Sequence, residues 1–310
     1  MLTDQSRLDD EDCPTFDSLL EVSLPLPENL SYYPNQVGGH ERILYSSELG
    51  TVYKRLEPFP KGPREVRFYE RVFNLHCRDK KLLELRKFLP VYTGLCHDQS
   101  SHNLYVSMED LLSGLEKPAV CDIKIGRTTH TPDATPAKLS AERAKYAWHK
   151  EIGFSVTAMK TYDSSTGEEI HRGKNQCRSL EPSEIYEKGI CLFLGEDLDR
   201  SRCLARNFAK KLSRLCHWFE TQRKIAFYAS SVLLSYDEQL DFKEKDTERS
   251  SAETDFSRTG GVRVYLIDFT RWRPSNGEKD ENFLYGLRNV VRMFRQASTD
   301  KQPLMAIKAE

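Results

Sequence analysis

The sequence predicts an α+β fold, and two observations support this prediction. Short β-branched stretches occur near the start of the chain and recur later, among them Thr51-Val52-Tyr53-Lys54 and Val262 to Phe269. Residues 200–228 carry the longest helical pattern, with apolar residues spaced for one buried stripe. At 310 residues the chain has room for one large domain or for two lobes.

The other elements follow from periodicity, turns and helix breakers. Residues 1–30 are acidic and then interrupted by prolines, so we expect them to be disordered. Strands are expected at 33–56, 91–95, 103–108, 120–125, 151–162, 230–234 and 262–269. Helices are expected to begin near Pro63 and to cover 81–89, 137–147, 200–228 and 283–296. Residues 237–261 are charged and rich in Ser and Thr, which predicts a flexible insert.

Composition narrows the class of protein and of partner. Hydrophobic residues make up 38% and charged residues 30%, as in a globular protein with a polar surface. The net charge of -1 gives no overall attraction to nucleic acid or membrane, so any anion-binding surface is local. No apolar run approaches the roughly 20 residues of a transmembrane helix, and the acidic start lacks the apolar part of a secretory signal. The eight cysteines form no C-x-x-C pair, so we expect reduced thiols and no zinc site.

The most informative stretch is Pro118-Ala119-Val120-Cys121-Asp122-Ile123-Lys124-Ile125-Gly126. Residues i and i+2 of a strand lie on one face, so Asp122 and Lys124 point into the same space. Opposite charges inside an apolar strand are costly unless something else is bound there. A nucleotide with its metal and an anionic acceptor would suit this pair. A half-buried salt bridge is the alternative.

A second pair of charged residues precedes this stretch. The chain has neither a G-x-x-x-x-G-K-[ST] loop nor a G-x-G-x-x-G loop, which excludes a Walker-type phosphate site. Lys54 lies on an expected strand and Glu65 on the following helix, an arrangement that protein kinases use to hold ATP phosphates. The alternative is a surface lysine and a solvated glutamate.

Basic residues follow the central stretch. Lys138, Glu142 and Lys145 have the spacing i, i+4 and i+7, which places them on one helical face. Such a face could bind a multiply phosphorylated ligand, because each phosphate takes several cationic or N–H donors. The alternative is a solvated face with local salt bridges.

Three motifs in order carry a family resemblance. They are Pro118-x-x-x-Asp122-x-Lys124-x-Gly126, Ser230-Ser231-x-Leu233-Leu234 and Ile267-Asp268-Phe269. Together they resemble the signature of the inositol polyphosphate kinase family, from about residue 33 to about residue 296, and most closely that of its multikinases. The resemblance implies a two-lobed fold, similar to protein kinases and ATP-grasp enzymes, with a small β-rich N-lobe at 31–108 and a C-lobe at 109–298. Within the C-lobe, 127–150 would bind the inositol phosphate, and 299–310 would be a tail.

The resemblance also implies a nucleotide site between the lobes, with ATP and Mg²⁺ as cofactors. Lys54, with Glu65 as its partner, would contact the ATP phosphates. The backbone around Glu109 and Leu111, where the chain crosses between lobes, would bind adenine. Asp122 would contact the ribose.

The remaining roles concern the transfer of the phosphoryl group and the binding of the acceptor. Asp268 would hold Mg²⁺, and Lys124 would stabilise charge at the transferring group, which makes Lys124, Asp122 and Asp268 the catalytic candidates. Glu142 stands where a glutamine is expected and Arg271 where family members often have a histidine. The candidates for binding substrate phosphates are Lys61, Lys124, Lys138, Lys145 and Arg271. Ser230 and Ser231 are expected to be structural.

The implied activity is ATP-dependent phosphorylation of inositol 1,4,5-trisphosphate and tetrakisphosphates at the 3- and 6-hydroxyls, toward the pentakisphosphate. Two alternatives remain: a hexakisphosphate kinase that makes diphosphoinositol phosphates, and a non-catalytic phosphoinositide-binding or scaffold protein. The expected partners are soluble inositol polyphosphates, with phosphoinositide lipid head groups as a further candidate and no direct nucleic acid. A monomer located in the nucleus and cytoplasm is expected from the family.

Overall fold

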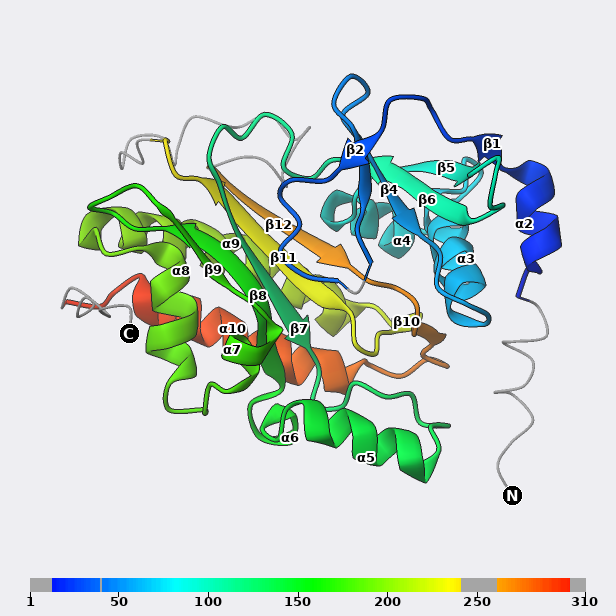
Figure 1. Ribbon diagram of the computed structural model, residues 1–310. Helices are drawn as coiled ribbons and strands as arrows, with labels where there is room; N and C mark the ends of the chain where they lie inside the picture. The colour runs from blue at the N-terminus through cyan, green and yellow to red at the C-terminus, as the bar shows by residue number, and fades with distance from the viewer. Residues whose placement is uncertain (1–12, 40, 241–260, 302–310) are drawn as a thin grey trace.

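The computed structural model describes residues 13–39, 41–240 and 261–301, and its two main β-sheets define two lobes (Figure 1). We call residues 13–109 the N-lobe and residues 110–301, where described, the C-lobe. The mixed α and β content confirms the predicted α+β fold. Among the described residues, no helix is both long and apolar enough to cross a lipid bilayer.

The N-lobe is built on a six-stranded sheet of order β1-β5-β6-β4-β3-β2. Its strands are β1 (Leu24–Pro25), β2 (Ser31–Tyr32), β3 (Leu44–Ser46), β4 (Thr51–Arg55), β5 (Tyr92–His97) and β6 (Leu104–Glu109). β1 pairs with β5 in parallel, and the other pairs are antiparallel. The helices of this lobe are α2 (Phe16–Val22), α3 (Lys61–Phe73), α4 (Lys80–Leu85) and the short 3-10 helix η1 (Arg86–Phe88).

The predicted disorder of residues 1–30 is wrong for residues 13–30. Thr15 caps α2 by accepting a hydrogen bond from the Ser18 N–H, and Leu19 is buried in the core. β1 then extends the edge of the sheet, and Leu26 N–H donates to His97 O. The prolines predicted an absence of regular structure, but β1 is an edge strand, where a proline is tolerated. Residues 1–12 lie outside the described residues.

The C-lobe is built on a five-stranded antiparallel sheet of order β12-β11-β7-β8-β9. The strands are β7 (Pro118–Ile125), β8 (Phe154–Tyr162), β9 (Glu169–Arg172), β11 (Ser231–Asp237) and β12 (Val262–Ile267), and β10 (Ile225–Ala226) pairs separately with β13 (Arg273–Pro274). Its helices are α5 (Pro136–Lys145), α6 (His149–Ile152), α7 (Lys174–Arg178), the π-helix η2 (Ile185–Cys191), α8 (Leu192–Leu194), α9 (Leu198–Thr221) and α10 (Glu281–Ala297).

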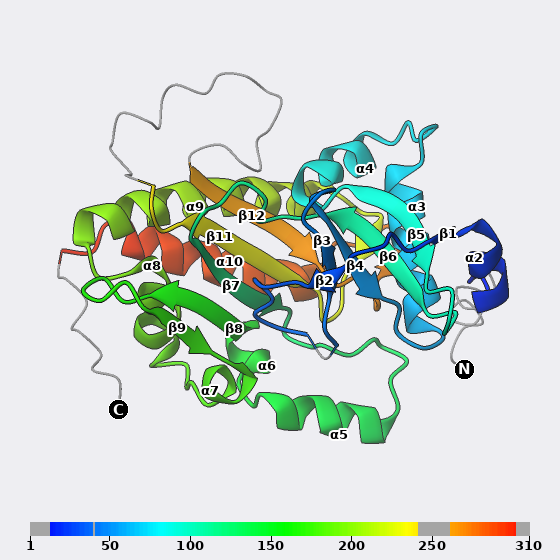
Figure 2. The same ribbon diagram turned by 45° about the horizontal axis from the view of Figure 1, so that its top comes forward.

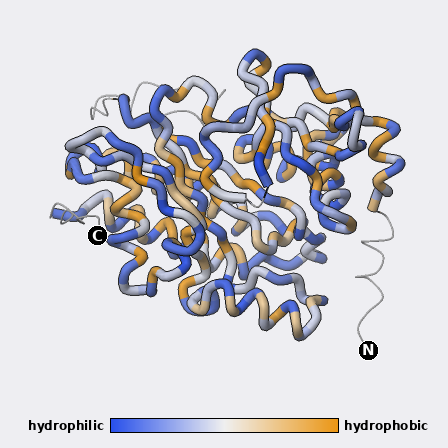
Figure 3. The backbone as a smooth tube through the Cα atoms, viewed as in Figure 1, coloured by the Kyte–Doolittle hydropathy of each residue, from blue (hydrophilic) through white to orange (hydrophobic). Residues whose placement is uncertain are grey.

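The long helices α9 and α10 lie side by side and cover one face of this sheet (Figure 2). Every residue of β8 is buried, because the strand lies inside the sheet with both faces covered. Figure 3 shows hydrophobic stretches along the central strands. The core of the C-lobe therefore supports the strand that carries Asp122 and Lys124.

Two predicted element boundaries are corrected. The helix predicted over 200–228 ends at Thr221, because the Gln222 side chain accepts from Lys224 N–H and Ile225 N–H and turns the chain into β10. The strand predicted over 151–162 begins only at Phe154, after helix α6 and Gly153 with a φ of 76°. Of the predicted insert at 237–261, residues 241–260 lie outside the described residues, as do residues 302–310 of the predicted tail.

Aromatic side chains join the two lobes beside the site. Phe68 of α3 stacks on Phe269 of the C-lobe with ring centroids 4.0 Å apart, and both rings are fully buried. Trp272 Nε1 donates to Arg64 O at 2.8 Å. These contacts attach the segment after β12 to α3, which fixes the position of Asp268 relative to the N-lobe.

Candidate active site

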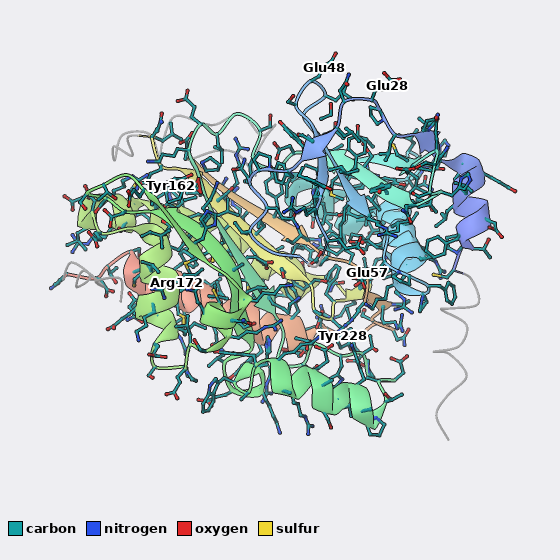
Figure 4. The ribbon with its side chains drawn as sticks, viewed as in Figure 1. Glu28, Glu48, Glu57, Tyr162, Arg172 and Tyr228 are labelled. Atoms are coloured by element: carbon teal, nitrogen blue, oxygen red, sulfur yellow. The ribbon has the colours of Figure 1, made fainter. Side chains whose placement is uncertain are left out.

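A cavity of about 400 Å³ lies between the lobes. Lys54 of β4 and Glu109 to Leu112 line it from the N-lobe side and the lobe crossing, while Asp122, Leu233 and Asp268 line it from the C-lobe. Glu57 also lines the cavity, and Figure 4 shows it at the boundary between the lobes. In the same view, Tyr162 and Arg172 lie far from the cavity, on the β8–β9 hairpin. Of the predicted site residues, the cavity lining contains Lys54, Glu109, Leu111, Asp122 and Asp268.

Lys54 links two carboxylates across the cavity. Its Nζ lies 2.8 Å from Glu65 Oε1 and 2.8 Å from Asp268 Oδ1, so the predicted Lys54–Glu65 pair is confirmed as a contact. Burial lowers the Lys54 pKa, but the charges of Asp268 and Glu65 outweigh this and raise it well above its usual value. Burial likewise raises the Asp268 pKa, yet Lys54 and Lys124 bring it down to about 2. Both groups are therefore charged at neutral pH.

Asp268 is held in an unusual backbone conformation. Its φ is 64°, a left-handed value that few non-glycine residues adopt. Ser230 Oγ donates to Asp268 O at 2.6 Å, which confirms the structural role predicted for this serine. The turn directs the carboxylate into the cavity, where 42% of the side chain stays exposed. A restrained, strained residue of this kind is typical of a functional position.

Asp122 lies deeper, and Ser231 and Lys124 are its polar neighbours. Its side chain is buried, and neither its Oδ1 nor the buried Ser231 Oγ has a hydrogen-bond partner within the described chain. Burial, with a contribution from Asp268, raises the Asp122 pKa to about 6 even though Lys124 opposes the shift. Because Asp122 also lines the cavity, its carboxylate is a candidate acceptor for the hydroxyl groups of a ligand.

Lys124 does not form the salt bridge that was the alternative interpretation. Its Nζ donates to Ala229 O at 2.8 Å, while Asp122 Oδ1 remains without a partner. A change of register between β7 and β8 occurs between Asp122 and Ile123, which locally alters the alternation of side chains expected for a regular strand. The Lys124 charge still lowers the pKa of both Asp122 and Asp268, so the three groups interact electrostatically.

Residues 33–39, which follow β2 of the N-lobe, contact the C-lobe. Lys160 Nζ donates to Asn35 Oδ1 at 2.8 Å, and Lys174 Nζ donates to Gly39 O at 2.7 Å. A Cβ at Gly38 would lie 3.1 Å from Asp122 Oδ2, so glycine allows the backbone to approach that carboxylate. Lys174 was missed from sequence, because no motif marks α7, yet its charge lowers the Asp268 pKa. It lines an adjoining, more open cavity of about 850 Å³.

Three of the four predicted phosphate-binding residues of the C-lobe come together around one carboxylate. Glu142 Oε1 lies 3.0 Å from Lys138 Nζ, 3.1 Å from Lys145 Nζ and 3.2 Å from Arg271 Nη1. The predicted helical face is therefore confirmed, as are its local salt bridges. We call these four side chains the Glu142 cluster.

Other predicted site residues have different surroundings. Lys61 lies at the start of α3 and pairs with Glu57. The Glu109 N–H donates to Val91 O, and Leu111 O accepts from Arg263 Nη1 at 2.7 Å, so these two backbone groups already have partners. The roles of Lys61, Glu109 and Leu111 in ligand binding stay predictions.

Glycines hold the segment 127–150 against the last helix. Gly126 N–H donates to Gly153 O at 2.7 Å, and a Cβ at Gly286 of α10 would lie 1.8 Å from that same oxygen. Asn282 Oδ1 accepts from the Thr128 N–H at 2.8 Å. These contacts set the position of α5 and its lysines relative to β7.

The imidazole of His149 in α6 is expected to make the free energy of unfolding depend on pH. Its ring bonds with Gly126 O at 3.2 Å and Ser155 Oγ at 3.1 Å, and burial lowers its pKa from 6.5 to about 4. A depressed histidine pKa stabilises the fold above pH 6.5, and this stabilisation is lost as the pH falls toward 4. We expect His149 to contribute about 2 kcal/mol less to the free energy of unfolding at pH 5 than at pH 7.

Urea unfolding of wild type and His149→Gln at pH 7 and pH 5 would measure this. The comparison is between the two proteins, because Asp122 and Asp280, whose pKa values are raised to about 6, shift stability in the opposite direction in both. The same change in unfolding free energy between the two pH values in both proteins would contradict the prediction.

The site fits a metal-bound nucleotide. Asp268 stays ionised and open to the cavity, and oxygen ligands of this kind suit Mg²⁺. Among the described residues there is no cluster of three or more His, Cys, Asp or Glu side chains that could hold a metal ion alone. A metal at Asp268 would then take further ligands from phosphate oxygens and water, as Mg²⁺ commonly does.

Solved structures share the fold. An inositol phosphate multikinase from S. cerevisiae, solved in complex with ADP and Mn²⁺, is 20% identical with a TM-score of 0.63 and covers 79% of this chain and 98% of its own. A second structure, from studies and engineering of inositol phosphate multikinase, has a TM-score of 0.57 at 23% identity and covers 75% and 98% of the two chains. These likenesses confirm the predicted two-lobed kinase fold.

Sequence relatives carry the same family name. Inositol polyphosphate multikinase of Rattus norvegicus is 35% identical over 237 residues, which is 73% of this chain and 57% of the relative, and the Homo sapiens enzyme is 37% identical over 61% and 45%. The chain thus spans about half the length of these curated relatives. A multikinase of Oryza sativa subsp. japonica is 26% identical over 83% and 91%. The family model for inositol polyphosphate kinase matches residues 105–295, more than half of the chain. The chain therefore belongs to the inositol polyphosphate kinase family.

Proposed function

We propose that the protein transfers the γ-phosphoryl group of ATP to hydroxyl groups of soluble inositol polyphosphates. Inositol 1,4,5-trisphosphate and tetrakisphosphates would be phosphorylated at the 3- and 6-hydroxyls, toward the pentakisphosphate. The observation that carries the proposal is the contact of Lys54 with both Glu65 and Asp268 at one cavity, where the charge of Lys124 also acts on Asp268. The names of the relatives and the ADP and Mn²⁺ in the yeast structure support it.

Each residue has a physical task in this proposal. Lys54, positioned by Glu65, supplies a fixed positive charge for phosphate oxygens, and the Asp122 carboxylate, which lines the cavity, accepts from ribose hydroxyls. Asp268 supplies the metal-binding carboxylate, and Lys124 offsets negative charge between donor and acceptor. ATP and Mg²⁺ supply the transferable phosphoryl group and the charge that neutralises it. Catalysis would rest on positioning and charge stabilisation.

The experiment is to incubate the protein with Mg-ATP and inositol 1,4,5-trisphosphate and to separate the products by anion exchange. Successive tetrakis- and pentakisphosphate peaks are expected. Conversion of the hexakisphosphate alone would favour the diphosphate-forming kinase, and a relative of that type, from Oryctolagus cuniculus, is 26% identical. Binding without turnover of any acceptor would favour the scaffold role.

Asp268→Asn is expected to reduce kcat by at least about a hundredfold, because the metal-binding charge is lost. Asp199→Asn is the matched control, since the Asp199 side chain is 97% exposed and pairs with Arg202 at the surface. Activity of the Asp268 variant equal to wild type would contradict the metal assignment. Three further predictions concern partners and location. Lipid-vesicle sedimentation would test binding to phosphoinositide head groups, and light scattering would test the monomeric state. Imaging of a tagged chain would test the location in nucleus and cytoplasm.

A further inference from the structure

Glu142 is a carboxylate buried among cations. Only 5% of its side chain is exposed, and a single oxygen, Oε1, lies within 3.2 Å of Lys138, Lys145 and Arg271. The second oxygen accepts from Thr129 Oγ1 at 3.1 Å. Burial raises the Glu142 pKa, but Lys138 and Arg271 outweigh this and lower it to about 2. The carboxylate is therefore charged throughout the neutral range.

The Glu142 cluster and its hydrogen-bond partner Thr129 join three parts of the chain. The two lysines come from α5, Thr129 comes from the loop before it, and Arg271 comes from the segment after β12, next to Asp268 and Phe269. Arg271 Nη1 also donates to Thr129 O at 2.7 Å. Glu142 thus holds α5 against the segment that carries the metal-binding candidate.

The carboxylate also changes the charge that a ligand meets. Three cations and one carboxylate sum to a charge of +2, whereas the cations alone would carry +3. Lys138 and Lys145 keep 42% and 44% of their side chains exposed, so they can reach a ligand, while Arg271 is 15% exposed. Glu142 Oε1 occupies the position between the three cations that a phosphate oxygen would otherwise take.

We propose that Glu142 determines acceptor specificity, because it cancels one positive charge of the cluster and thereby favours acceptors that present fewer phosphates there. This inference rests on the proposed function. It predicts a preference for a trisphosphate over more highly phosphorylated inositols. Removing the carboxylate charge would attract an additional phosphate to the cluster.

The test is the ratio of kcat/KM for an inositol tetrakisphosphate to that for inositol 1,4,5-trisphosphate. Glu142→Gln keeps the shape but removes the charge, and we expect the ratio to rise about fivefold or more at low salt and to fall back as salt is added. Glu142→Asp keeps the charge and should keep the wild-type ratio. Glu184→Gln, in which a carboxylate that pairs with Lys188 is replaced, makes the same change in net charge elsewhere and should leave the ratio unchanged.

Lys138→Gln keeps the test decisive if Glu142→Gln does not fold, because Lys138 is partly exposed and its loss should lower the ratio. An unchanged ratio in Glu142→Gln, or in Lys138→Gln where it must replace that variant, would overturn the inference. An equal rise in Glu142→Asp or in Glu184→Gln would do the same. If wild type phosphorylates the acceptors but the substitutions do not change the ratio of kcat/KM values, only the inference fails. If wild type phosphorylates no inositol phosphate, the proposed function fails as well.

Discussion

Replacing Asp122 by asparagine is expected to stabilise the fold and to weaken ATP binding at the same time. The folded pKa of about 6 lies above the ordinary 3.8, so ionising this buried carboxyl costs stability as the pH rises through 6. The cost at pH 8 is about 3 kcal/mol, and at pH 5 it falls to about 1.5 kcal/mol. Asparagine avoids this cost because it carries no charge.

The opposite effect on ligand binding follows from the position of the Asp122 carboxylate in the lining of the cavity. An amide accepts hydrogen bonds from ribose hydroxyls less strongly than a carboxylate, so we expect ATP to bind roughly tenfold to a hundredfold more weakly. Urea unfolding at pH 8 and pH 5 and nucleotide titration would measure the two effects. The Asp199→Asn protein should match wild type in both. Lower stability of Asp122→Asn at pH 8 would show that the carboxylate has a stabilising partner in the folded protein.

Replacing Gly286 by alanine is expected to destabilise the protein severely. The new Cβ would lie 1.8 Å from Gly153 O and 3.2 Å from Gly126 N, and both neighbours are backbone atoms. Since α10 cannot move away without opening the core around Phe283 and Leu287, we expect a loss of at least about 3 kcal/mol in unfolding free energy. Thermal and urea unfolding would measure it.

Gly173→Ala is the matched control, because a Cβ there meets no atom within 4 Å and the residue has a φ of -83°. This variant should differ from wild type by less than about 1 kcal/mol. A Gly286→Ala protein as stable as wild type would mean that β8 and α10 can separate without cost. The substitution is also informative for function, because the close contact of Gly286 with Gly153 and Gly126 positions the segment 127–150.

Much of the fold was predictable from local patterns. The apolar stripe of α9 and the β-branched runs of β7 and β12 are signals of period and composition, and the order of three short motifs indicated the family. The helix predicted over 137–147 is present as α5 (Pro136–Lys145), and its Lys138, Glu142 and Lys145 face followed from spacing. Errors arose where a local signal was weak: residues 16–25 read as disordered, but docking on β5 and burial of Leu19 give them structure.

The sequence on its own therefore identified which residues carry charge into apolar surroundings, since Lys54, Glu65, Asp122, Lys124 and Asp268 all interrupt or adjoin periodic apolar segments. Only the tertiary structure decided their partners. Lys54 and Asp268 are 214 residues apart and meet through the packing of α3 on Phe269, and Lys124 bonds with Ala229 O rather than Asp122. Arg271 joins Glu142 because the segment after β12 packs against α5 and the loop before it. Periodicity depends on neighbours along the chain, whereas these ion pairs depend on how distant elements pack, which no local pattern records.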